Sequence, residues 1–182
     1  MTTASIIAIG SEMLGPVRVD TNSLRITAAL ENRGIGVVRK SVVGDDLDTI
    51  VAELEWSITS SDIVVVTGGL GPTDDDLTRA ALVKAFGLDT EVDPSIIERI
   101  EARFAARGWT MPAVNRRQGV VFRGQETLQN EVGTAPGFHL RVRGKDVWVF
   151  PGVPQELDWM IEKYFRPWLA ERSGGVTRCR RV

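Results

Sequence analysis

Glycine and aspartate residues gather in one short stretch of the sequence, GGLGPTDDDLT at residues 68–78. Its glycines permit positive φ and close backbone approach, so the amides of residues 69–73 can point at an anion such as phosphate. Three aspartates, residues 74–76, follow at once. The stretch is neither a Walker A motif nor a GxGxxG fingerprint, so it supports a generic dinucleotide site only weakly. It predicts instead a phosphate site that carries negative charge.

Further carboxylates follow other predicted strands, since Asp20, Asp45 and Glu156 lie in three separate connections. In a parallel sheet such connections meet beyond the carboxyl ends of the strands, so these side chains should share one cleft. Bare carboxylates repel one another and a phosphate. A hard divalent cation such as Mg, Mn, Co or Ni binds carboxylate and phosphate oxygens together and removes this conflict. The alternative is a solvated acidic rim, in which each residue caps a helix or turn for at most about 1 kcal/mol.

The chain has one histidine and one cysteine, His139 and Cys179. One residue of each type excludes an internal disulfide, a cysteine zinc site, and Ser-His-Asp, Cys-His or HExxH chemistry. Alternation in GFHLRVRG places His139 on the solvent side of a strand, opposite Phe138 and Leu140. Catalysis must therefore use carboxylates, hydroxyls, amides, lysine or arginine, and we expect a metal.

The composition excludes several classes of partner. The 182 residues carry a net charge of -2 at pH 7, which lacks the broad basic field of nucleic-acid binders. The length fits one domain, which buries roughly 70% of its unfolded surface. No apolar run approaches the roughly 20 residues that span a bilayer, and the N-terminus does not resemble a signal peptide. We therefore expect a cytoplasmic protein with neither a nucleic-acid nor a membrane partner.

These residues must be positioned by alternating strands and helices. Expected strands lie in ASIIAIG, GVVRKSVVG and DIVVVTGG, and expected helices span residues 21–32, 47–59 and 74–86. This order is typical of a parallel sheet covered by helices on both faces. Further on, the patterns predict a helix capped by Asp93, a short helix in MPAVNRRQG before a strand at 120–122, a hairpin turning at Gly144, and a final helix over 155–169.

The predicted domain spans residues 1–172. The last ten residues, 173–182, have the sequence SGGVTRCRRV. They are typical of a linker or the start of a following domain, with a frayed terminus as the alternative.

At these motifs the chain resembles the molybdopterin-binding-domain superfamily, and specifically the N-terminal domain of the CinA (competence/damage-inducible protein A) family. The resemblance covers about residues 5–170. It rests on the segments GSEML, VDTNS, VGDD, TGGLGPTDDDLT, NRRQ, NEVGTAPGF and FPGVPQE, in that order.

The resemblance implies an α/β fold, a three-layer α/β/α sandwich with a mostly parallel sheet and a short antiparallel hairpin. It also implies metal-dependent hydrolysis of ADP-ribose to AMP and ribose 5-phosphate. By motif position, Asp45 and Asp76 are the expected catalytic residues and metal ligands. We expect Glu156, which follows the last strand, as a third ligand. The alternatives are a molybdopterin adenylyl- or molybdotransferase-like enzyme and a non-catalytic nucleotide-binding module. In this family, a separate C-terminal domain deamidates nicotinamide mononucleotide. The resemblance therefore does not imply that activity for these 182 residues.

The expected ligand is a nucleotide-like small molecule. Members of the family commonly self-associate, so we expect a homo-oligomer. We expect Asp76→Asn to abolish activity with little change in melting temperature. The expected substrate-binding residues are Gly10, Ser11, Glu12, Asp20, Asn22, Gly68, Gly69, Gly71, Pro72, Thr73, Thr78, Asn130, Gly133, Thr134, Gly152 and Pro154.

Three departures from the family pattern bear on this site. Leu70 stands where molybdenum-cofactor relatives usually have threonine, which favours the CinA branch. Pro16, with a glycine one position earlier than usual, and Glu131 in place of proline both lie at the rim of the expected cleft.

Overall fold

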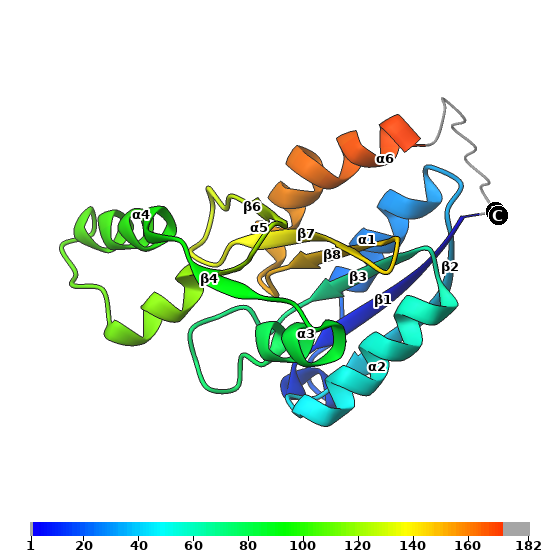
Figure 1. The fold of residues 1–182 in the computed structure, drawn as a ribbon, viewed down its shortest axis with the longest axis horizontal. Coiled ribbons are helices and arrows are strands. Elements are labelled where there is room, and N and C mark those ends of the chain that lie inside the picture. Colours follow the sequence, from blue (N-terminus) through cyan, green and yellow to red (C-terminus); the bar gives the residue numbers. More distant parts are fainter. Residues whose placement is uncertain (1, 173–182) are drawn as a thin grey trace.

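A six-stranded sheet forms the centre of the computed structural model, which describes residues 2–172 (Figure 1). Its strands run in the order β2-β1-β3-β8-β7-β6. The first four are parallel, β7 pairs antiparallel with β8, and β6 pairs antiparallel with β7. They span β1 Thr3–Ile9, β2 Gly36–Val43, β3 Ile63–Thr67, β6 Glu126–Leu128, β7 Gly137–Val142 and β8 Lys145–Phe150. The segment 173–182, with Cys179, lies outside the described residues.

Helices cover both faces of the sheet, which confirms the three-layer α/β/α prediction (Figure 1). One face carries α1 Asn22–Glu31, α5 Pro154–Met160, the π-helical turn η3 Ile161–Phe165 and α6 Arg166–Arg172. The other carries α2 Leu47–Ser60, α3 Thr78–Phe86 and part of α4 Pro94–Ala105. Successive residues of a strand point to opposite faces, so Ile6 joins the first core and Ile7 the second, both fully buried.

A smaller unit lies beside one end of the sheet. Strands β4 Thr90–Val92 and β5 Val120–Phe122 pair antiparallel, and α4 packs against the short 3-10 segment η2 Ala113–Gly119 (Figure 1). Asp93 caps α4 by accepting a hydrogen bond from the Ser95 amide, as predicted. The remaining 3-10 turn, η1 Ser11–Leu14, follows β1.

Two predicted helices have different boundaries. The helix expected over residues 74–86 begins at Thr78, because residues 74 and 75 form a turn instead. The helix expected over residues 155–169 consists of α5 and α6 joined by the π-helical turn, which inserts one wider turn where Tyr164 contacts the Gln129 carbonyl.

Among residues 2–172, no helix is both long enough and apolar enough to cross a bilayer.

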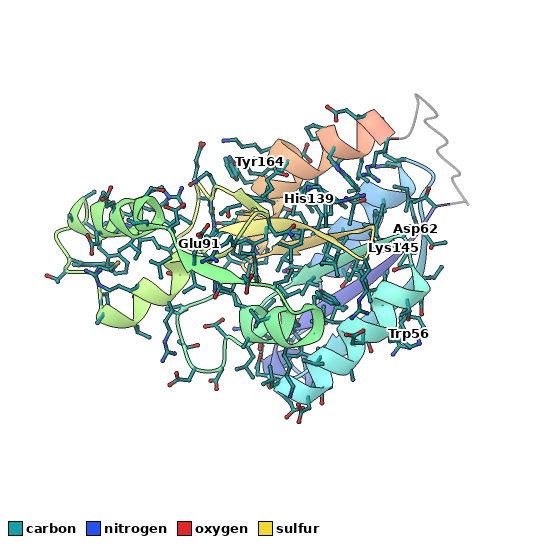
Figure 2. All side chains as sticks on the ribbon, viewed as in Figure 1. Trp56, Asp62, Glu91, His139, Lys145 and Tyr164 are labelled. Carbon is teal, nitrogen blue, oxygen red and sulfur yellow. The ribbon has the colours of Figure 1, made fainter. Side chains whose placement is uncertain are left out.

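The prediction that His139 faces solvent is wrong. Its side chain, labelled in Figure 2, is only 12% exposed. Its ring stacks on Trp148 with centroids 4.2 Å apart and makes an edge contact with Trp168. The two ring nitrogens lie 3.0 Å from Glu126 Oε2 and 2.9 Å from Asp146 Oδ1. Alternation placed the residue on the correct face, but α6 covers that face.

Candidate functional site

A cavity of about 610 Å³ lies at the carboxyl ends of the parallel strands. Its walls come from the connections after β1, β2, β3 and β8 and from the segments at residues 118 and 134–135. Small-molecule sites occupy roughly 300–1,000 Å³ and, in open α/β sheets, lie at this edge. The cavity therefore has the size and the place expected of a ligand site.

Many of the predicted site residues line this one cavity. They come from five separated parts of the chain, as the topology argument requires. They are Gly10, Glu12, Asp45, Gly68, Gly69, Gly71, Pro72, Asp76, Thr134, Gly152, Pro154 and Glu156.

Other predicted site residues do not line the cavity and instead hold its walls in place. They are Ser11, Asp20, Asn22, Thr73, Thr78, Asn130 and Gly133. Asp20, for example, accepts a hydrogen bond from the Ser23 amide, and buried Thr78 donates its hydroxyl to the Gly68 carbonyl. The structure shows their supporting contacts, and their predicted contact with a ligand stays a prediction.

Asp76 braces the glycine-rich loop. Its carboxylate accepts hydrogen bonds from the Gly71 amide at 2.7 Å, the Thr73 amide at 2.8 Å and the Thr73 hydroxyl at 2.6 Å. The amides of Gly71 and Thr73 are therefore paired with Asp76, which differs from the expectation that they point at a phosphate. The Gly69 and Leu70 amides have no partner within the described chain, so they are the amides of residues 69–73 that are still free to donate to a ligand.

Asp45 is held from the opposite wall by Ser11. The Ser11 amide donates to Asp45 Oδ2 at 2.8 Å, and the Asp45 amide donates to the Ser11 hydroxyl at 2.9 Å. The neighbouring Asp46 is the cap of α2, since its side chain accepts from the Thr49 amide and hydroxyl. The helix cap is therefore Asp46 and not Asp45. Asp45 lines the cavity, and its second oxygen, Oδ1, has no hydrogen-bond partner in the described residues.

Glu156 occupies a half-buried wall of the cavity. Asn130, which is fully buried, donates to Glu156 Oε2 at 2.6 Å and to the Ala135 carbonyl, while its own oxygen accepts from the Val132 and Gly133 amides. Burial raises the pKa of Glu156 above its ordinary value, against the Asn130 hydrogen bond and the charge of Arg103. A side chain at Gly133 would overlap the Glu156 carboxyl group, so this glycine makes room for it.

Asn22 ties two walls together. Its side-chain amide donates to the Thr67 hydroxyl at 3.2 Å and to the Gly152 carbonyl at 2.8 Å, and Thr67 donates to the Pro151 carbonyl. The start of α1 is therefore bonded directly to the end of β3 and to the turn after β8. Asn22 therefore positions the turn at Gly152, and Gly152 itself lines the cavity.

The acidic residues do not form a complete metal cage. Within residues 2–172, no group of three or more His, Cys, Asp or Glu side chains is placed to hold one ion. The predicted trio of Asp45, Asp76 and Glu156 therefore lines one cavity without forming a ready three-ligand set. A site built from one or two carboxylates, with the remaining ligands from phosphate and water, is typical of Mg²⁺.

Several lining residues were not predicted. Arg18, Asp75 and the almost fully buried Gln118 are polar, and Gln118 accepts from the Asn115 amide group at 3.2 Å. NRRQ was recognised as a motif, but its distance along the chain from the strand ends hid its place in the cavity. The apolar residues missed are Ile9, Ala135, Pro151 and Val153, whereas Leu70 had been expected there only through its backbone amide.

A buried cation supports the glycine loop from behind. Arg79 of α3 donates to the Leu70 carbonyl at 3.0 Å and to the Val120 carbonyl at 3.2 Å, and so connects this loop to β5. Burial lowers the pKa of Arg79 to about 10, while nearby Asp76 acts in the opposite direction. The guanidinium remains charged at neutral pH and offsets part of the negative charge at Asp76.

The chain matches a family profile described as "Probable molybdopterin binding domain" over residues 5–171. It is 46% identical to a CinA-like protein of Solibacter usitatus over 92% of this chain and 40% of that protein. A CinA-like protein of Deinococcus deserti is 39% identical over 92% of this chain and 42% of its own length. The chain thus spans about two fifths of these curated relatives.

Solved structures agree. The crystal structure of CinA from Thermoplasma acidophilum, described as a protein of unknown function, has a TM-score of 0.83 and 33% identity, covering 91% of this chain and 98% of that one. A molybdopterin biosynthesis protein from Mycobacterium abscessus has a TM-score of 0.62 at 20% identity, covering 95% and 94%. The second likeness concerns the fold alone.

Proposed function

Because the chain belongs to the family described as "Probable molybdopterin binding domain", and within it to the CinA-like proteins, we propose that it is a metal-dependent phosphoanhydride hydrolase. The proposed substrate is ADP-ribose, which water splits into AMP and ribose 5-phosphate. The observation that supports this most is the meeting of a glycine loop and acidic side chains from separate connections in one cavity of about 610 Å³. The proposal concerns these residues, which span only part of the longer relatives.

The charge of the cavity favours a metal. Five carboxylates line it with a single arginine, so an anionic diphosphate would meet net repulsion without a cation. Asp45 Oδ1 and Glu156 Oε1 have no protein partner in the described residues, whereas both oxygens of Asp76 are engaged by its own loop. The residues therefore fit a divalent ion that takes one or two protein carboxylates, with Asp45 the foremost candidate, Glu156 the second and Asp76 acting through the loop.

Each part of the cavity has a role in the proposed reaction. When bound, a divalent ion supplies charge neutralisation and lowers the pKa of water. The Gly69 and Leu70 amides donate to phosphate oxygens, and Asp76 keeps the loop that carries them in shape. Thr134 and the turn at Gly152 contact the ribose or base. Water attacks one phosphorus atom, the P–O bond of the anhydride breaks, and the leaving phosphate departs with the bridging oxygen.

The test is release of AMP from ADP-ribose by the purified chain with Mg²⁺, Mn²⁺, Co²⁺ or Ni²⁺, against an EDTA control. Asp45→Asn should lower kcat by about 100-fold or more, the scale seen when one stabilising electrostatic contact is removed. Asp48→Asn is the matched control, because Asp48 is an exposed aspartate of α2 outside the cavity that pairs with Lys84. Turnover that survives EDTA, or an unaffected Asp45→Asn variant, would contradict the proposal.

The likeness of the fold to molybdopterin biosynthesis proteins favours one second candidate, an adenylyl- or molybdotransferase-like enzyme. That enzyme would bind molybdopterin and leave ADP-ribose intact. A non-catalytic nucleotide-binding module would bind ADP-ribose without turnover under any of the four metals. Three expectations stay predictions: a homo-oligomer, a cytoplasmic location and the absence of a nucleic-acid partner. Light scattering of the protein after size-exclusion chromatography measures its oligomeric state.

A further inference from the structure

Arg18 is the only lysine or arginine among the cavity-lining residues of the described chain. It shares this cavity with five carboxylates. The carboxylates that line the same cavity are Glu12, Asp45, Asp75, Asp76 and Glu156.

Arg18 has no protein partner to account for its position. Within residues 2–172 it forms no hydrogen bond, ion pair or ring contact. Several other exposed arginines are paired, for example Arg25 with Asp158 and Arg116 with Glu101. Its guanidinium is therefore available, and the planar five-donor group matches two phosphate oxygens at once.

The segment that carries Arg18 is fastened only at its ends. Ser11 and Asp45 exchange two hydrogen bonds before it, and Asp20 accepts from the Ser23 amide after it. Residues 15–19 make no hydrogen bond within the described chain, and Val17 and Val19, on either side of Arg18, are 89% and 78% exposed. Little packing resists a small movement of this segment toward a bound anion.

We propose that Arg18 is a substrate-binding residue that grips a phosphate of a diphosphate ester from the η1–α1 segment, opposite the amides of Gly69 and Leu70. This inference rests on the proposed function for its substrate class. It predicts that the cavity selects ligands with two linked phosphates, because one phosphate faces the glycine loop and the other faces Arg18. It also makes substrate affinity dependent on ionic strength, since an exposed charge pair is screened by salt.

The experiment compares Arg18→Gln and Arg18→Lys with Arg107→Gln in the full 182-residue chain. Arg107 is an exposed arginine outside the cavity that forms no ion pair in the described structure, so it is the charge-matched control. For ADP-ribose hydrolysis, Arg18→Gln should raise KM about tenfold, or about 1.4 kcal/mol, with kcat within about twofold, because uniform binding is lost. Arg18→Lys should recover part of the loss, and the KM of Arg18→Gln should rise less steeply with KCl than that of the wild type.

A binding measurement separates this inference from the proposed function. Inorganic pyrophosphate is titrated calorimetrically into each variant, with Mg²⁺ and with EDTA, and Arg18→Gln should bind it about tenfold more weakly. If the wild type binds pyrophosphate through Arg18 but does not hydrolyse ADP-ribose, the hydrolase proposal fails and the role of Arg18 stands. If ADP-ribose is hydrolysed and Arg18→Gln matches the wild type in KM and pyrophosphate affinity, Arg18 is not a phosphate ligand. A wild type that binds no pyrophosphate also overturns the inference.

Discussion

The carboxylate of Asp76 accepts three hydrogen bonds from its own loop and thereby shapes the surface that a ligand meets. Such a side chain affects activity through the position of the Gly69 and Leu70 amides as well as through its charge. Asp45 differs, because one of its oxygens is left for a ligand. The family motif gave Asp45 and Asp76 the same expected role, but their hydrogen bonds differ.

Asp76→Asn should lower both stability and activity, which revises the expectation of an unchanged melting temperature. The new amide group would turn a donor toward the Gly71 or Thr73 amide, and the loss of one such partly exposed hydrogen bond costs about 1 kcal/mol. Urea unfolding followed by circular dichroism measures the change. Asp75→Asn is the control, because Asp75 is exposed and makes no hydrogen bond in the described structure; equal stability of both variants would show that the brace contributes nothing.

At the element scale, the end of β3 must turn sharply beside β1 for the cavity to exist. Gly68 has φ +100°, and its amide donates to the Phe150 carbonyl at 3.0 Å. A Cβ at this position would overlap the Ile9 carbonyl oxygen of the neighbouring strand. Strand β3 can therefore pass into the loop only through a residue without a side chain.

Gly68→Ala should destabilise the protein by more than Gly124→Ala. Both glycines have positive φ, +100° and +72°, so both substitutions bear a conformational cost of roughly 1–2 kcal/mol. Only Gly68 has a neighbour in the way, whereas nothing lies within 4 Å of a Cβ at Gly124. Chemical denaturation of the two variants measures the difference, and equal losses would rule out the strand contact as the cause.

In the molecule as a whole, the cavity and a cluster of charged side chains around Asp146 lie at opposite ends of the sheet. The cavity lies beyond Thr67 and Phe150, whereas Asp146 lies opposite Ile63 at the other end of the same strands. Asp146, with a side chain 3% exposed, meets Arg141 at 2.7 Å and Arg172 at 2.9 Å as well as His139. Figure 2 shows His139 between the sheet and the C-terminal helix, so this cluster fastens α6 to the sheet.

Asp146→Asn should therefore lower stability without changing KM for ADP-ribose. The substitution weakens charge-assisted hydrogen bonds worth about 1.5–3 kcal/mol, because the two arginine partners are about half exposed and stay solvated. It also lies far along the strands from the cavity. The unfolding free energy and KM are measured on the same preparation. Glu162→Gln is the control, since its exposed i,i+4 pair with Arg166 contributes about 0.3–0.5 kcal/mol. A KM change in Asp146→Asn would mean that the two ends are coupled.

Periodicity and turn chemistry were enough to predict the layers, the order of β1, α1, β2, α2 and β3, the hairpin at Gly144 and the edge of the sheet where the cavity lies. These features follow from local patterns and from the rule that parallel strands share a carboxyl end. The same rule gathered Asp45, Asp76 and Glu156 around one cavity.

The roles of individual side chains depended on contacts between distant segments. Whether Asp76 faces a ligand or its own loop, whether Asn130 lines the cavity or holds Glu156, and whether His139 meets water or α6 are each settled by neighbours that come from elsewhere in the chain. The place of Arg18 in the cavity was also not predicted, because its loop carries no periodic pattern that could indicate where the side chain lies. Hydrogen-bond competition and packing are properties of the assembled chain, and local sequence patterns do not encode them.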